Sequence, residues 1–318
     1  MLVKLGLWER FEADGHPHCY ARRSVWGAPE PVELDGLIDP DGFGWRLDRR
    51  RFERSLRLSA QEKGAILLAP ARPATVERDA GGWRISLDDG REVETRLLID
   101  AAGRSSRLLR RFGARRRAAD RLICAWTHAP LRREAAEITY TESEPDGWWY
   151  SAPLPGGRRI LAFHTDADLP AAQMLRDDRL VRRALARPAL SRELGDCDLS
   201  AAAPARLCAA HGARLGTVAG DGWFAAGDAA TAFDPLSSQG LFNALYTGMA
   251  AAEAAGKALA GEEAAAAGYA GRLDEIWAAY ERRLALFYGA ERRWPGSPFW
   301  ARRFSLTAVP HASADDRP

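Results

Sequence analysis

The stretch that most constrains the fold runs from residue 223 to residue 259. It opens with the apolar run WFAA at 223–226, continues through the loop GDAATAFDPLSSQG at 227–240, and ends in an alanine-rich segment. A short apolar run suits a buried strand, and the alanine-rich segment has helical character. We therefore predict a strand whose C-terminal end carries Asp228, then a loop, then a helix that begins at Gly240.

This predicted corner offers two features to a ligand. The Asp228 carboxylate can accept hydrogen bonds from sugar-like hydroxyl groups, and the first N–H groups of a helix have no partner inside the helix. A ligand with a polyol chain and an electron-rich ring edge, such as a flavin, suits both features. In the alternative interpretation Asp228 is only a turn residue and Pro235 only stiffens the loop. The four residues GDAA do not decide between the two.

Length and charge narrow the classes of function. A chain of 318 residues can bury the core of one large domain or of two intertwined ones. Its 45 basic and 43 acidic residues are interspersed, which does not favour a nucleic-acid surface. We expect arginine clusters such as residues 115–117 to lie in solvent.

Cysteine use and hydropathy bear on the compartment. The 4 cysteines are far apart and form no CxxC pair, which indicates reduced thiols in a cytoplasmic protein. No apolar run approaches the roughly 20 residues that span a bilayer, and the N-terminus lacks the pattern of a secretory signal. We therefore expect a soluble, cytoplasmic protein without a membrane partner.

The N-terminal part contains two candidate sites. Residues 2–8 read as the end of a helix, and the cluster HPHC at 16–19 invites a metal, but no second cluster completes a tetrahedral set, so we predict no metal site. Arg49 then falls in the first turn of a predicted helix in which residues 52, 56 and 60 share a face. A cation is disfavoured at a helix N-terminus, so we expect an anion beside Arg49. Asp48 or the phosphates of a dinucleotide could supply it.

Residues 65–113 predict strands, turns and a short helix. An apolar run at 65–68 suits a strand, and turn signals at 79–82 and 88–90 suit an antiparallel meander. Residues 97–100 predict a further strand. The turn AAGRSS at 101–106 then leads to a helix that Ser105 or Ser106 caps and Gly113 ends.

The second half contains a strand-like region followed by a helical region. From residue 122 to about 206 the pattern predicts an antiparallel sheet with a helical stretch near 175–186. Aromatic residues such as Trp148 on such a sheet belong either to its core, which we favour, or to a substrate surface. Residues 261–304 predict helices, because apolar residues at 273, 276, 277, 280 and 284 recur at helical spacing. Residues 305–318 are expected to be frayed.

The loop at 227–241 resembles the second flavin motif of the superfamily of FAD-dependent aromatic hydroxylases and tryptophan halogenases. The resemblance implies that Asp228 holds the flavin ribityl chain, that Pro235 lies along the isoalloxazine, and that the backbone at Gly240 and Leu241 faces the pyrimidine edge. The sequence DPLSSQGL at 234–241 is similar to the corresponding motif of a halogenase-like branch of this superfamily. That branch includes flavoproteins that mature quinone cofactors within other proteins.

Three further segments are similar to the same superfamily. Residues 100–106, DAAGRSS, resemble its other flavin motif, and residues 47–56 resemble the segment whose arginine, here Arg49, reaches the FAD pyrophosphate. Trp148, Tyr150 and Pro153 partly match the halogenase signature Trp-x-Trp-x-Ile-Pro. Hydroxylases that use NADPH directly carry an aspartate where Ala102 stands, which implies that an external flavin reductase supplies reduced flavin.

The resemblance implies FAD as the cofactor and predicts that the segments at Arg49, at Gly103 and from Asp228 to Gly240 converge on one trough. No residue is predicted to be catalytic. The predicted cofactor-binding residues are Arg49, Asp100, Ala102, Gly103, Gly227, Asp228, Pro235, Ser237, Ser238, Gly240 and Leu241.

The implied fold is of the mixed α/β (α+β) class. It combines an FAD-binding Rossmann-like domain with an antiparallel substrate domain and a C-terminal helix. The expected segments are 1–48 as a substrate-side entry segment, 49–120 and 206–260 as two parts of the FAD-binding domain, 121–205 as the substrate domain, and 261–318 as a helical segment.

The sequence contains no Gly-x-Gly-x-x-Gly motif, with which the superfamily begins. We therefore expect an N-terminally truncated flavoenzyme that lacks its first βαβ unit. The alternative is a short protein that has lost its cofactor. A sheet without its first strand leaves unpaired backbone groups, so we expect poor folding, aggregation and weak FAD binding.

The resemblance implies an FAD-dependent monooxygenase that oxygenates an aromatic substrate, either a small molecule or a protein side chain, through a C4a-hydroperoxyflavin. A halogenase is one alternative, although Ser237 and Gln239 stand where halogenases carry glutamate and threonine, and the region of the halogenase lysine is absent. A cofactor-less remnant that binds a protein partner is the other.

Overall fold

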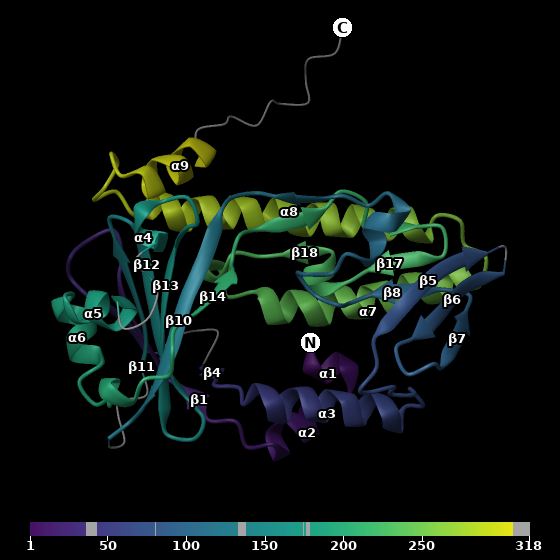
Figure 1. Cartoon of the computed structure of the whole chain (residues 1–318), viewed down its shortest axis with the longest axis horizontal. Helices are drawn as coiled ribbons and strands as arrows, with labels where there is room; N and C mark the ends of the chain where they lie inside the picture. The colour runs from purple at the N-terminus through teal and green to yellow at the C-terminus, as the bar shows by residue number, and fades with distance from the viewer. Residues whose placement is uncertain (36–42, 80, 133–137, 174, 176–178, 308–318) are drawn as a thin grey trace, which may run out of the picture. The chain divides into compact units, whose positions relative to one another are not determined.

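The computed structural model describes residues 1–35, 43–79, 81–132, 138–173, 175 and 179–307 (Figure 1). The chain forms two compact units, each assembled from three separate stretches of sequence. Unit 1 consists of Met1–Gly15, Arg49–Asp120 and His211–Tyr280, and unit 2 of His16–Asp48, Arg121–Ala210 and Glu281–Pro318.

A small sheet with a parallel strand pair forms the centre of unit 1. Strand β8 (Leu98–Asp100) pairs in parallel with β17 (Trp223–Ala225), which pairs antiparallel with β16 (Ala219–Gly220). Helices α7 (Gly240–Leu259) and α8 (Ala265–Ala290) follow in sequence. The predicted strands at 97–100 and 223–226 and the helix that begins at Gly240 are thus confirmed. The core of unit 1 includes Phe224, Ala225, Ala250, Ala251 and Leu273.

Two more three-stranded sheets belong to unit 1. The predicted meander is confirmed as β5 (Pro73–Asp79), β6 (Gly82–Leu87) and β7 (Glu92–Thr95), antiparallel throughout. The other sheet has the order β18-β15-β9, formed by β9 (Arg116–Ala118), β15 (Ala213–Leu215) and β18 (Thr231–Ala232).

The predicted strand at residues 65–68 is wrong. These residues form no strand in the structure, and Ile66 and Leu67 are 87% and 47% exposed. An apolar run becomes a strand when a neighbour supplies hydrogen bonds and covers its side chains. No strand in the described part of the chain does this for residues 65–68.

The short helices of unit 1 depart from prediction in detail. Residues 2–8 form α1 (Leu2–Leu5), which Gly6 ends at φ 66°, and the start of α2 (Trp8–Ala13), in place of one helix end. Helix α3 (Arg49–Glu62) is confirmed, with Phe52 buried. The helix predicted before Gly113 is a 3-10 turn, η1 (Leu108–Phe112), with Arg107 at the N-cap position. The Ser106 hydroxyl accepts the Leu108 N–H at 3.4 Å, and Gly113 ends the turn as predicted.

A seven-stranded sheet with the order β14-β10-β13-β12-β11-β2-β3 forms unit 2 and confirms the predicted antiparallel sheet. Figure 1 shows its long strands side by side. Within this sheet, as far as the structure describes it, β11–β2 is the one parallel pair and the other pairs are antiparallel. The strands are β2 (Ala21–Val25), β3 (Val32–Asp35), β10 (Leu122–Pro130), β11 (Ile138–Glu144), β12 (Gly147–Leu154), β13 (Arg158–Asp166) and β14 (Arg206–Ala209).

Short helices and loops complete unit 2. They are α4 (Pro170–Gln173), α5 (Arg179–Leu185), α6 (Pro188–Glu193), η2 (Leu199–Ala201), α9 (Pro298–Thr307) and a two-stranded ribbon of β1 (His18–Cys19) and β4 (Gly44–Trp45). Helix α5 lies within the stretch predicted to be helical. Leu180 and Leu190 pack with Trp149 and Phe163 in one core. Of the residues expected to be frayed, 308–318 lie outside the described ones.

Two aromatic residues of β12 are core residues. Trp148 is buried and stacks on His164, with ring centroids 3.6 Å apart, and its indole N–H donates to the Tyr288 hydroxyl. Trp149 is buried too, and its indole N–H donates to the Glu144 carboxylate. Both contacts favour the core interpretation for this pair.

The units also cut across the predicted segments. Residues 206–210, expected with the FAD-binding domain, lie in unit 2 because β14 pairs with β10. The first 48 residues divide at Gly15, since β2 joins the large sheet of unit 2. The predicted C-terminal segment divides inside α8, after Tyr280.

The described residues contain no group of three or more histidine, cysteine, aspartate and glutamate side chains arranged to hold a metal ion. None of their helices combines the length and the apolar character that crossing a membrane requires.

Candidate cofactor-binding site

The two sequence motifs meet at one edge of the parallel pair in unit 1. Strands β8 and β17 run in the same direction and end at Asp100 and Ala225, so the turns that follow them emerge side by side. The Ala226 N–H extends the ladder by donating to the Asp100 carbonyl at 2.9 Å. The 3-10 turn η3 (Gly227–Ala229) comes next and carries Asp228.

Asp100 shapes the first turn. Its buried carboxylate accepts one hydrogen bond from the Ala102 N–H at 3.0 Å and another from the Ser106 hydroxyl at 2.5 Å. Gly103 has a φ of 80°, which a residue with a side chain rarely adopts. A Cβ added at Gly103 would meet no atom within 4 Å, so the turn borders open space.

Arg104 links the two motifs. Its guanidinium donates to the carbonyl of His211 and, at 3.2 Å, to the carbonyl of Phe233, and its Nε lies 3.8 Å from an Asp228 carboxylate oxygen. A residue of the first motif therefore orients the carboxylate and the loop of the second. The sequence motif includes Arg104, but its side chain was given no role there.

Arg116 corrects the expectation that residues 115–117 lie in solvent. Arg115 and Arg117 are exposed, but Arg116 is half-buried and donates to the carbonyl of Ala229, next to Asp228. Alternation along β9 explains the difference, because successive side chains of a strand point to opposite faces. The Nε and Nη1 groups of Arg116 are buried without a hydrogen-bond partner among the residues that the structure describes.

The charges of three arginines act on the Asp228 carboxylate, and Arg104 lies 3.8 Å from it. Burial raises the pKa of Asp228, and the positive charges of Arg104, Arg116 and Arg49 act in the opposite direction. Of the three charges, that of Arg49 has the smallest effect on Asp228. Arg49 pairs with the Glu53 carboxylate, one helical turn further on at 2.8 Å, an anion that the sequence analysis does not name.

Burial and the neighbouring Arg104 charge lower the pKa of Arg116. Burial disfavours the charged guanidinium and the like charge of Arg104 repels it, while the Asp228 and Asp100 carboxylates act in the opposite direction. The arginines near Asp228 offer guanidinium donors, which suit an anionic ligand.

The loop after Asp228 is held by groups that the sequence analysis missed. Asp234 is buried, accepts the Leu236 N–H at 2.9 Å as cap of the 3-10 turn η4 (Pro235–Ser237), and donates its own N–H to the Tyr280 hydroxyl at 2.9 Å. The Ser237 hydroxyl donates to the Asp234 carbonyl at 2.8 Å. The Asp-Pro pair was the available signal, since it favours the start of a turn.

Helix α7 begins where this loop ends. The Gly227 N–H donates to the Thr247 hydroxyl of α7 at 2.7 Å, which ties the Asp228 turn to the helix. Pro235 and Ser238 are exposed and Leu241 is half-buried, while a Cβ at Gly240 would meet no atom within 4 Å. The N–H groups of the first helical turn therefore border open space.

These residues fit FAD. An acceptor carboxylate that is 36% exposed, nearby cations and a helix start stand beside open space at Gly103 and Gly240. A polyol chain and a diphosphate need donors and acceptors of these kinds.

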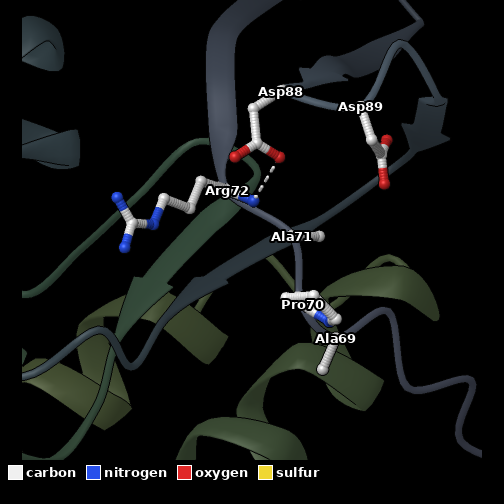
Figure 2. Close-up of a pocket in the computed structure, with 6 residues that line it drawn as sticks. All are labelled: Ala69, Pro70, Ala71, Arg72, Asp88 and Asp89. Atoms are coloured by element: carbon white, nitrogen blue, oxygen red, sulfur yellow. Dashed lines mark hydrogen bonds between the residues drawn. The ribbon is translucent and has the colours of Figure 1, made fainter.

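Another hollow of unit 1 does not involve these residues. Figure 2 shows a pocket of about 480 Å³ where the Arg72 N–H donates to the Asp88 carboxylate at 3.0 Å. Ala69, Pro70, Ala71 and Asp89 complete its lining. None of the predicted cofactor-binding residues lines it.

Comparison with known proteins decides the family. Residues 28–315 match the model of the tryptophan halogenase family. The chain belongs to this family. Members and relatives include FAD-dependent oxidoreductases, hydroxylases and halogenases, so the predicted family and the FAD cofactor are confirmed.

Three relatives illustrate the family. LodB of Marinomonas mediterranea, assigned to the FAD-dependent oxidoreductases, is 26% identical over 302 residues, which are 92% of this chain and 80% of LodB. The peptidyl tryptophan dihydroxylase QhpG is 27% identical with a TM-score of 0.79, covering 95% of this chain and 67% of QhpG. The myxobacterial halogenase CndH shares the fold, at 22% identity and a TM-score of 0.81, covering 95% of this chain and 74% of CndH.

Proposed function

We propose that this protein is an FAD-dependent monooxygenase that oxygenates an aromatic group, in particular an aromatic side chain of another protein. The observation that carries the proposal is the Asp228 carboxylate held among Arg104, Arg116 and Arg49 beside the start of α7. The relative QhpG supports the class of substrate, because QhpG is a dihydroxylase of peptidyl tryptophan.

Each part of the corner has a role in this proposal. Asp228 accepts hydrogen bonds from the ribityl hydroxyls, Arg49 binds the pyrophosphate, and the N–H groups at Gly240 and Leu241 face the pyrimidine edge. The turn around Asp100, Ala102, Gly103 and Gly227 and the loop with Pro235, Ser237 and Ser238 shape the space between them. FAD, when bound and reduced, supplies the activation of oxygen.

The electron donor in this proposal is a separate flavin reductase. Ala102 stands where hydroxylases that use NADPH directly have an aspartate, and its side chain is exposed. A methyl group offers nicotinamide no charge and no hydrogen bond.

The test supplies the chain with FAD, a flavin reductase, NADH, oxygen and a tryptophan-containing peptide. The expected product is the peptide with one or two added oxygen atoms, detected by mass spectrometry. Asp228→Ala should abolish product, and Asp221→Ala, at an exposed position before β17, should not. Unmodified peptide, with FAD shown to be bound, would contradict a monooxygenase of this substrate class.

Halogenation is the second candidate, favoured by the family model and by CndH. Ser237 makes halogenation the weaker candidate. It stands where halogenases carry a glutamate, it has no carboxylate, and its hydroxyl donates to the Asp234 carbonyl. The same reaction run with chloride or bromide separates the two, since only a halogenase incorporates halogen. A chain that fails to bind FAD at any concentration would instead favour a remnant that binds a protein partner.

A further inference from the structure

Two of the four cysteines lie opposite each other in unit 2, although 84 residues separate them in sequence. Cys124 is in the middle of β10 and Cys208 is in the edge strand β14, and the antiparallel register pairs them directly. The Cys208 thiol donates to the Cys124 carbonyl at 3.7 Å. Since directly opposed residues project to the same face of a sheet, the two sulfur atoms share one side.

The ladder fixes the kind of pair. The Ala210 N–H donates to the Leu122 carbonyl at 2.9 Å, which makes residues 122 and 210 a hydrogen-bonded pair. Two positions further on, Cys124 and Cys208 form a pair of the same kind. The Cα atoms of such pairs lie about 5.5 Å apart, within the range of roughly 4.4–6.8 Å that disulfides require.

The two thiols differ in access. All four residues of β14 are exposed, so Cys208 can meet a small oxidant in solvent. Cys124 is buried, and both its hydrogen bond with Cys208 and its burial raise the pKa of its thiol. Cys208 is therefore the sulfur that an oxidant reaches, and Cys124 is the sulfur that stands next to the product.

We propose that Cys124 and Cys208 are a redox-active pair that a peroxide converts reversibly into a cross-strand disulfide. The Cys208 sulfur attacks one peroxide oxygen, the O–O bond breaks, and Cys208 becomes a sulfenic acid while water or an alcohol leaves. The Cys124 sulfur then attacks the Cys208 sulfur, the S–O bond breaks, and water leaves with the Cys124 proton. Together the thiols lose two electrons, which reduce the peroxide.

The bridge should be easy to reduce. Opposed Cβ atoms lie about 4.5–5.5 Å apart in a ladder, while a disulfide needs about 3.8 Å. Closing the bond therefore pulls β14 towards β10. An edge strand has only one hydrogen-bonded neighbour and can follow, but the remaining strain favours the reduced form.

The other two cysteines provide internal controls. The Cys19 thiol donates to the Ala21 carbonyl at 3.8 Å and lies 3.5 Å from the Thr139 hydroxyl. Cys197 is buried and forms an isolated bridge with Leu131. Neither cysteine is paired with a second cysteine across a ladder.

The experiment treats the full chain with hydrogen peroxide, alkylates the remaining thiols, and analyses a non-reduced tryptic digest by mass spectrometry. Cleavage after arginine releases Cys124 in residues 122–132 and Cys208 in residues 207–214. The expected result is a cross-link between these two peptides that disappears on treatment with dithiothreitol. Cys19 and Cys197 should remain alkylated.

Single variants sharpen the test. Cys124→Ser and Cys208→Ser should each abolish the cross-link, whereas Cys19→Ser and Cys197→Ser should leave its yield unchanged. The oxidised wild-type chain should also melt at a higher temperature than the reduced one, because the bridge restrains the unfolded chain. Peroxide treatment that leaves both thiols alkylated, or that carries Cys208 to sulfinic acid in the presence of Cys124, would overturn the proposal.

Discussion

Arg104 and Arg116 show how single guanidinium groups connect segments that are far apart in the sequence. Arg104 leaves the turn after β8 and reaches the carbonyls of His211 and Phe233 and the carboxylate of Asp228. Arg116 reaches the Ala229 carbonyl from β9. Asp228 is thereby oriented and charge-balanced by residues that lie more than a hundred positions before it.

We expect Arg104→Gln to lower the free energy of unfolding by about 1–3 kcal/mol, because it strips charged donors from two carbonyls. FAD binding should weaken as well, since Asp228 loses its neighbour. Urea unfolding and titration of FAD fluorescence measure the two effects. Arg107→Gln, at an exposed position three residues on, is the control and should change neither. Equal behaviour of both variants would remove Arg104 from the site.

Arg116→Met should move the pH dependence of FAD binding. Burial raises the pKa of Asp228 and the Arg116 charge holds it down, so removing that charge raises this pKa further. A protonated carboxyl is a weaker acceptor for the ribityl hydroxyls that we propose Asp228 binds, so affinity for FAD should fall as pH falls through the pKa. In Arg116→Met this loss should begin at a higher pH than in the wild type. Arg117→Met, on the exposed face of β9, should titrate like the wild type.

At the scale of elements, the loop after α8 is anchored by Glu291. The buried Glu291 carboxylate accepts hydrogen bonds from the Gly27 N–H at 2.8 Å, from the Ser143 hydroxyl at 2.6 Å and from Arg293. Burial opposes its ionisation, but these donors outweigh burial and lower its pKa to about 2. Glu291 thereby ties the end of α8 to the ends of β2 and β11.

Glu291→Gln should cost about 3 kcal/mol of unfolding free energy at neutral pH, because it leaves Arg293 without its buried partner. The native pKa lies below the ordinary 4.5, so the wild-type stabilisation is present above pH 4.5 and is lost as pH falls towards about 2. Urea unfolding of the wild type and of Glu291→Gln at pH 7 and near pH 3 should show that their difference in unfolding free energy is smaller at the lower pH. Glu281→Gln, exposed on α8, is the control. A gap that stays constant with pH would contradict the assignment.

Sequence patterns predicted most elements but few side-chain contacts. The β8 and β17 strands, helix α7 and the meander carry local signals, namely apolar runs, Asp-Gly turns and helical spacing. Arg116 could not be recognised because its inward direction depends on the strand register of β9. The Cys124–Cys208 pair had no local signal either, because strand order brings distant residues together.

At residues 65–68 the local pattern predicted a strand that the structure does not contain. The composition of this run is that of a buried strand, yet Ile66 and Leu67 are exposed in the structure. Local pattern reports what a segment can do, while the presence of a neighbouring strand decides what it does. Strand β8 has a neighbour, β17, but its Ile99 side chain is also 38% exposed.

For the whole molecule, these exposed residues predict self-association. Apolar side chains on a surface favour contacts between copies, and β8 ends the described order of its sheet. We expect Ile66→Lys to lower the share of oligomer in size-exclusion chromatography with light scattering. Leu286→Lys adds the same charge at an exposed leucine of α8 in unit 2 and should have a smaller effect. An unchanged profile for Ile66→Lys would assign the association to another surface.

Both units are discontinuous, so the chain passes from one to the other five times. Neither can be cloned as a single uninterrupted gene fragment: residues 121–210 alone would carry β11 without β2, its parallel neighbour. A ribosome completes neither unit until the third stretch of that unit has emerged. Chimaeras that exchange a unit between relatives therefore require grafts at several junctions at once, including one inside the continuous helix α8.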